Sequence, residues 1–109
     1  MKVQVKEVTQ RYPKDKLILE WARARQILQN SSRLAQLGKL EEEFFELSEA
    51  IDTKNEAEIK DALGDMYVVM TLVANMSNLT MAECVDHAYN EIKDRKGYLN
   101  EQGVFVKEV

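Results

Sequence analysis

Apolar residues recur at helical spacing through the middle of the chain. One stripe, at intervals of three or four residues, consists of Leu40, Phe44, Leu47 and Ile51. After a short polar link the same spacing returns at Ile59, Leu63, Met66, Met70 and Val73. Such spacing places apolar side chains on one face of an α-helix. The pattern therefore predicts two long antiparallel helices that pack along their apolar faces.

Start and stop signals extend this pattern to four helices. Asp15 is the predicted N-cap of the first helix. Asn55 and Thr80 are each followed three residues later by Glu, which is typical of a helix start. Gly97 is the expected stop of the last helix. The predicted helices span residues 15–28, 32–52, 55–75 and 80–96, between an N-terminal arm at 1–13 and a tail at 98–109 that contains a short extended segment.

Composition narrows the class of protein. The 109 residues are enough for one domain, and the shares of apolar (45%) and charged (31%) residues are ordinary for a soluble globular protein. A net charge of −4 argues against non-specific binding to nucleic acid. The most apolar run, residues 66–74, is too short to span a membrane, and the N-terminus lacks the apolar region of a signal peptide. The single Cys84 favours a reducing location, and we expect a cytoplasmic protein.

The third predicted helix indicates self-association. From Met66 onward it is apolar on almost every side, and such a helix must be surrounded by other elements. Three other helices of a short chain do not suffice, so we expect a second copy of the protein to cover it. Phe45, which points away from the apolar stripe, is a predicted subunit contact. The predicted fold is all-α, a compact up-down four-helix unit assembled as a homodimer or a dimer of dimers.

Acidic residues border the apolar stripes of both long helices. Glu43 and Glu46 lie on one border of the second helix, and Asp65 occupies the matching border of the third. Like charges at this spacing destabilise a helix by about 0.2–0.5 kcal/mol per pair. A hard divalent cation removes that repulsion, since Mg²⁺ prefers carboxylate oxygens. The pattern predicts a site for Mg²⁺, or for Mn²⁺ in its place; a solvated acidic face is the alternative interpretation.

At these residues the sequence resembles the MazG-like all-α nucleoside triphosphate pyrophosphohydrolases. The motif of that family is Glu-Glu-x-x-Glu followed, after a spacer, by Glu-x-x-Asp. Glu42-Glu43-Phe44-Phe45-Glu46 matches the first half fully, and Ala62-Leu63-Gly64-Asp65 matches the second half except at Ala62. The resemblance runs from about residue 17 to residue 97. It implies an all-α NTP pyrophosphatase fold and cleavage of a triphosphate between its α and β phosphates.

The departure at Ala62 leaves the ligand set open. Asp61, one helical turn before Asp65, is the predicted replacement, which gives a metal set of Glu43, Glu46, Asp61 and Asp65. Glu58 is the other candidate for the missing oxygen ligand. A set of only three carboxylates, with weak or no metal binding, is the remaining alternative.

The resemblance also suggests roles for residues outside the acidic motif. A carboxylate not fully engaged by metal, Glu42 or Glu46, would orient or deprotonate the attacking water. Trp21 is a core or interface anchor by its residue type and a base-stacking residue by the resemblance. The end of the last helix carries Asn90, Lys93, Arg95 and Lys96, whose cations either complement the helix dipole or contact the triphosphate.

The predicted function is therefore Mg²⁺-dependent hydrolysis of a nucleoside or deoxynucleoside triphosphate to the monophosphate and pyrophosphate, in the cleaning of nucleotide pools. Two alternatives remain at this stage. One is a helical oligomerisation module with an acidic surface and no chemistry. The other is a catalytically inactive relative that binds nucleotide or metal, which the substitution at Ala62 favours. The sequence names neither the base nor the sugar of the substrate.

Overall fold

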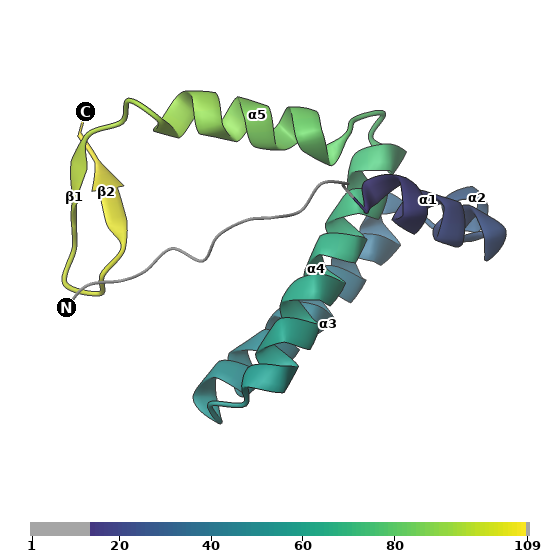
Figure 1. The fold of residues 1–109 in the computed structure, drawn as a ribbon, viewed down its shortest axis with the longest axis horizontal. Helices are drawn as coiled ribbons and strands as arrows, with labels where there is room; N and C mark the ends of the chain where they lie inside the picture. The colour runs from purple at the N-terminus through teal and green to yellow at the C-terminus, as the bar shows by residue number, and fades with distance from the viewer. Residues whose placement is uncertain (1–13, 109) are drawn as a thin grey trace.

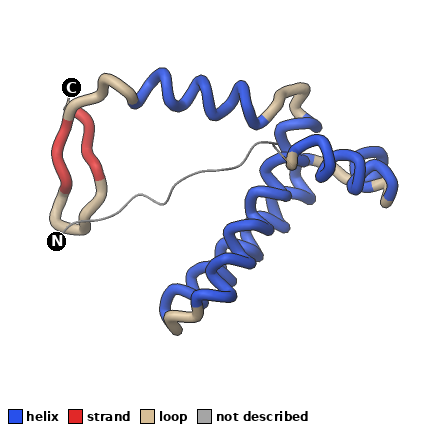
Figure 2. The backbone as a smooth tube through the Cα atoms, viewed as in Figure 1, coloured by secondary structure: helices blue, strands red, loops and turns tan. Residues whose placement is uncertain are grey.

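The computed structural model describes residues 14–108, so the predicted arm at 1–13 lies outside the described part. The described chain is mostly helical, as expected. Five helices are followed by a two-stranded hairpin (Figure 1; Figure 2 shows the same view by type of element).

Two long antiparallel helices form the centre of the molecule. They are α3 (Arg33–Asp52) and α4 (Glu56–Met76), and they lie side by side along most of their length (Figure 1). Side-chain caps begin both helices: Ser32 Oγ accepts from the backbone N–H of Ala35 at 3.0 Å, and Asn55 Oδ1 accepts from that of Glu58 at 3.1 Å. These caps satisfy backbone donors that the first turn leaves free. The helical hairpin predicted from the sequence is confirmed.

The face that α3 presents to α4 differs from the predicted stripe by about one position. Phe44 and Ile51 were expected in the core, yet each is more than half exposed. The buried side chains of α3 are Glu43 and Ala50, and Leu47 beside them is partly buried. On α4 the equivalent change exposes Leu63 and buries Ala62, Val69, Leu72 and Ala74. Small alanines at the seam suit a close approach of the two helices, and the larger residues are left on the outside of this chain.

The first predicted helix is broken into two. α1 (Asp15–Ala24) ends before Gln26, whose φ of 61° is left-handed, and α2 (Ile27–Asn30) follows. A left-handed residue ends an α-helix. Residues other than Gly rarely adopt this conformation, so a Gln in the sequence does not predict it. Asp15 is the first residue of α1 and not its N-cap, which is Lys14. Asp15 instead accepts a hydrogen bond of 2.8 Å from the Tyr67 hydroxyl, which ties α1 to α4.

The last helix, α5 (Met81–Ile92), starts as predicted and ends early. Thr80 and Glu83 form a complete capping box. The helix was expected to continue to residue 96 and stop at Gly97. Gly97 instead begins β1 (Gly97–Leu99), which pairs antiparallel with β2 (Phe105–Lys107). A Cβ at Gly97 would collide with the backbone of Val106, so the glycine permits close strand approach. The extended segment predicted in the tail is confirmed.

The chain by itself is not the compact four-helix unit that was predicted. α5 leaves the end of α4 and projects away from α3, with the β-hairpin at its far end (Figure 1). The radius of gyration is 16.5 Å, against about 13 Å for a typical compact domain of this length. The prediction of a compact unit within one chain was wrong. An amphipathic pattern shows that one face of a helix packs against other residues, but it does not show whether those residues belong to the same chain.

The helices were also compared with the dimensions of a membrane span. No single helix among residues 14–108 is long and apolar enough to cross a membrane. α4 and α5 meet that criterion only as a pair bent by 100°, by length and composition alone, and core helices meet it too.

Candidate metal centre

Three carboxylates from two helices converge on one point. Glu43 and Glu46 lie one turn apart on α3, and Asp65 faces them from α4. One oxygen from each of these residues lies within 4.8 Å of the other two. Glu43 precedes the turn residue Lys54 by as many positions as Asp65 follows it, so the antiparallel hairpin brings the two level. This convergence, predicted from the helical spacing, is confirmed; the three residues are called the acidic triad below.

The triad lies at the edge of the core, where charge repulsion is poorly screened. Glu43 is only 4% exposed, whereas Asp65 is partly exposed and Glu46 is exposed. Oε2 of Glu43 is buried and has no hydrogen-bond partner among the described residues. A buried carboxylate oxygen without a partner is unfavourable. The oxygen ligands and the missing partner both fit a hard divalent cation.

The electrostatics of the metal-free triad oppose its ionisation. Burial raises the pKa of Glu43 above its ordinary value, and the neighbouring Glu46 raises it further, against the opposing effect of Lys39. Burial also raises the pKa of Asp65, followed by the charges of Asp61 and Glu43. The pKa of Lys39 is raised by its contacts with Glu42 and Glu43. A cation bound at the triad would offset this repulsion between the carboxylates.

These shifts predict how stability depends on pH. A carboxylate whose pKa is raised in the folded state stabilises the fold below its unfolded pKa of about 4. That contribution is lost as the pH rises through the higher folded pKa. With metal removed by EDTA, the Tm of the wild type should therefore rise relative to that of Glu43→Gln as the pH is lowered from about 7 toward about 4.5. Parallel Tm profiles of the two proteins, measured by differential scanning fluorimetry, would contradict the assignment.

A cavity of about 810 Å³ opens beside the triad. Glu43, Asp65 and Lys39 form part of its wall, and its apolar floor includes Val69 and Leu72. Its rim consists largely of polar and aromatic side chains from α1, α2 and the start of α3: Trp21, Arg25, Gln26, Asn30, Ser31 and Gln36. The volume lies within the range of small-molecule sites, which combine an apolar lining with a few polar groups.

Trp21, predicted from the resemblance as a base-stacking residue, lies on this rim. It is 44% exposed, and the Arg25 guanidinium lies 5.3 Å from the centroid of its ring. Because the guanidinium lies over one face of the ring, a planar ligand would stack on the other face or replace Arg25. Its stacking role stays a prediction.

Asp61, the expected fourth ligand, is not part of the triad. It lines a second, smaller cavity of about 390 Å³ with Glu46, Glu49, Glu58 and Ala62. Glu46 thus belongs to the triad and also lines this second cavity, together with both candidates for the missing oxygen ligand. Ala62 is 2% exposed, at the seam with α3. The choice between Asp61 and Glu58 stays open.

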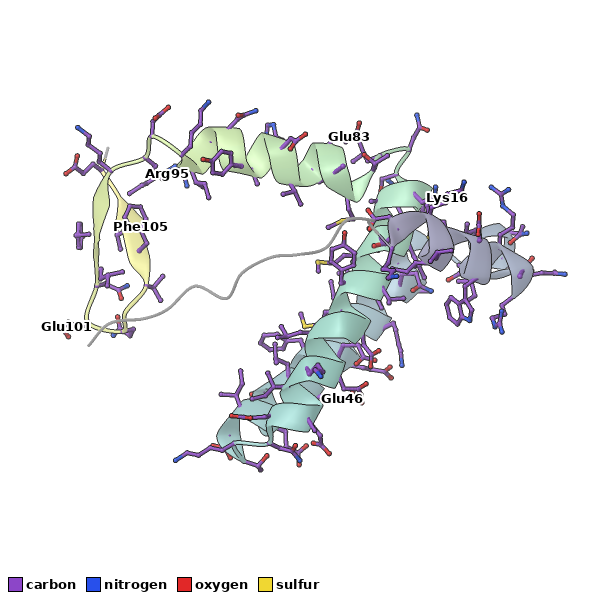
Figure 3. All side chains as sticks on the ribbon, in the orientation of Figure 1. Lys16, Glu46, Glu83, Arg95, Glu101 and Phe105 are labelled. Atoms are coloured by element: carbon purple, nitrogen blue, oxygen red, sulfur yellow. The ribbon has the colours of Figure 1, made fainter. Side chains whose placement is uncertain are left out.

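The other proposed site residues separate into two groups. Glu42, a candidate for orienting water, is exposed and pairs with Lys39 at 3.3 Å. Asn90, Lys93, Arg95 and Lys96 lie at the far end of α5 or just beyond it. Figure 3 shows Arg95 near the β-hairpin, far along the molecule from Glu46. Within one chain these cations do not reach the triad; Arg95 and Lys96 line a separate surface hollow with Lys107.

Lys39, which contacts the triad within the described part of the chain, was not among the predicted site residues. Lys39 Nζ lies 3.4 Å from Oε1 of Glu43. Lys39 precedes Glu43 by one helical turn, and this spacing, common for ion pairs in helices, is the signal that was available. Arg25, Asn30 and Gln36 were missed as well, because only the fold brings them to the cavity.

Comparison with known proteins agrees with this geometry. The family model of the MazG nucleotide pyrophosphohydrolase domain matches residues 31–99, which include the whole α3–α4 hairpin and α5. An uncharacterised 18.2 kDa protein from the rep-hol intergenic region of Haemophilus phage HP1 is 36% identical over 64 residues. The match covers 59% of this chain and 39% of the phage protein, so the chain spans well under half of that relative. The search of solved structures gave no match.

Proposed function

Because the chain belongs to the MazG nucleotide pyrophosphohydrolase family, we propose that it hydrolyses a nucleoside or deoxynucleoside triphosphate to the monophosphate and pyrophosphate. The observation that supports this most is the convergence of Glu43, Glu46 and Asp65, because Glu43 and Asp65 also line a cavity that has the size of a small-molecule site. The cut between the α and β phosphates follows from the family.

The triad would hold Mg²⁺, or Mn²⁺ in its place, with Asp61 or Glu58 as a further oxygen ligand. A divalent cation there supplies charge neutralisation and lowers the pKa of a bound water. Glu43, which is the most buried of the three, fixes the position of the site on the α3–α4 hairpin. Glu46, which is exposed, or Glu42, which is exposed one turn earlier on α3, would accept a proton from the attacking water.

The cavity would hold the nucleoside. Trp21 would stack on the base, and the amides of Asn30 and Gln36 on the same rim are groups that hydrogen-bond to the edges of bases. The floor of Val69 and Leu72 excludes water from one side of the ligand. This arrangement directs the phosphates toward the triad.

We also propose that the active form is a homodimer or a dimer of dimers. None of the residues of α5 is buried within the chain. Val85, Tyr89 and Ile92 form one apolar face of that helix and are each more than half exposed. Isolated helices of this length are marginal in water, and the described residues leave α5 largely uncovered, so we expect packing against a second copy to stabilise it. In this assembly we propose that the cations Lys93, Arg95 and Lys96 steady the triphosphate across the subunit boundary.

One alternative keeps specific support. At Ala62 this chain departs from the acidic motif of the family, and a site with three carboxylates suits a protein that binds metal or nucleotide without turnover.

Turnover tests the proposal. Each of the common NTPs and dNTPs is incubated with the protein and Mg²⁺, and the products are separated by ion-exchange chromatography. We expect monophosphate and pyrophosphate in equal amounts from at least one substrate, and none from the Glu46→Gln variant. Diphosphate and orthophosphate would overturn the assigned cut. No product from any nucleotide, with Mn²⁺ bound, would establish the binding protein instead.

A further inference from the structure

Lys39 occupies an unusual position between the triad and the cavity. Its ammonium lies 3.4 Å from Glu43 and 3.3 Å from Glu42, and its side chain lines the same cavity as Trp21 and Asp65. The side chain is 53% exposed, whereas that of Glu43 is 5% exposed. One end of this ion pair is therefore fixed in the core while the other lies on a flexible stem.

Among residues 14–108 of the metal-free protein, Lys39 is the cation that forms an ion pair with the triad. It reaches Oε1 of Glu43, and the buried Oε2 of the same carboxylate has no partner among residues 14–108. One ammonium therefore compensates only part of the charge of three converging carboxylates. A divalent cation on the triad would repel the ammonium of Lys39, because both would face the same carboxylate from a few ångströms away.

The cavity offers Lys39 an alternative partner. A lysine stem with four carbons and rotatable donors adapts to different positions, and an ammonium binds phosphate as a point charge. Lys39 lines the same cavity as Trp21, Glu43 and Asp65. A triphosphate that binds in this cavity with its phosphates at the triad would therefore come within reach of the Lys39 ammonium, which lies 3.4 Å from Glu43.

We propose that Lys39 exchanges partners: it pairs with Glu43 in the metal-free protein and with a substrate phosphate once a divalent cation is bound. Lys39 is thus a positioning residue with two effects. Without nucleotide it competes with the metal for Glu43, and with the metal bound it supports the binding of nucleotide. This inference rests on the proposed function, because it needs both a metal and a polyphosphate at the site.

The exchange predicts two effects of opposite sign from one substitution. In Lys39→Met, Mn²⁺ should bind at least about threefold more tightly without nucleotide, as measured from the EPR signal of free Mn²⁺. The same variant should bind an α,β-imido dNTP analogue about tenfold more weakly in saturating Mn²⁺, as measured by calorimetry. Such a loss is typical of a charge-assisted phosphate contact. Lys39→Arg should retain nucleotide affinity within about threefold.

Lys60→Met is the matched control, since it removes the same charge from an exposed position on α4 outside the cavity. It should change neither affinity. Weaker Mn²⁺ binding or unchanged nucleotide affinity in Lys39→Met would overturn the exchange. If Lys39→Met folds poorly, the same two affinities are measured on Lys39→Gln. A wild type that binds no Mn²⁺ would overturn the proposed function, and with it the exchange. If the wild type binds Mn²⁺ and hydrolyses nucleotide, but Lys39→Met has the same affinities for Mn²⁺ and nucleotide as the wild type, the exchange alone is overturned.

Discussion

Replacing Glu43 by Gln should leave the metal-free protein folded and abolish its response to Mg²⁺. The Gln side chain has nearly the same shape, and its amide N–H groups can donate to Glu46 and Asp65 where the carboxylate of Glu43 repels them. The Tm in EDTA should therefore be equal to or above that of the wild type. The lost contact with Lys39, a half-exposed ion pair, is worth less than about 1 kcal/mol.

The same variant should lose the metal and the activity that depends on it. Mg²⁺ raises the Tm of the wild type by mass action, and that rise should be absent in Glu43→Gln. Because metal catalysis contributes several kcal/mol, pyrophosphate release should fall by at least about 100-fold. Glu41→Gln, an exposed change two positions away, is the control and should behave as the wild type does. A Glu43→Gln variant that keeps its Mg²⁺-dependent Tm rise would remove Glu43 from the ligand set.

The triad was predictable from the sequence because it depends on local rules and one tight turn. Caps at Ser32 and Asn55 define where the two helices begin, and helical spacing then fixes which positions of each helix meet. Which residues of α3 and α4 contact each other was harder to predict. Phe44 has the residue type of a core position, yet the small Ala50 and Ala62 set the contact, and choosing between two adjacent faces requires the partner helix.

The cavity was not predictable by the same means. Its rim combines α1, α2 and the start of α3, and this arrangement depends on the break at Gln26. A left-handed residue other than Gly or Asn carries almost no local signal. Trp21 was identified through the resemblance and not by its spacing, whereas Arg25 and Gln36 have ordinary helical surroundings in the sequence. Lys39 was overlooked because an ion pair on one helix is usually only a surface feature.

The position of α5 leads to the second large expected effect. On the proposed assembly through α5, the double variant Tyr89→Glu, Ile92→Glu should convert the oligomer to a monomer, as measured by light scattering with size-exclusion chromatography. Burying each of these side chains is worth about 1.5–3 kcal/mol, so losing both weakens association by at least about 100-fold. Charges placed on a buried apolar interface raise that penalty further.

His87→Glu tests whether the effect is specific to the apolar face. It adds a negative charge on the opposite side of α5, where His87 is exposed and contacts only Glu91 at 3.4 Å among the ion pairs of the described chain. This control should keep the oligomeric state of the wild type, since a like-charge pair at this spacing costs only about 0.2–0.5 kcal/mol. A wild type that is monomeric at micromolar concentration, with a Tm independent of protein concentration, would contradict the assembly. The expectation of an assembly comes from α5, because residues 14–108 bury none of its side chains and isolated helices of its length are marginal in water.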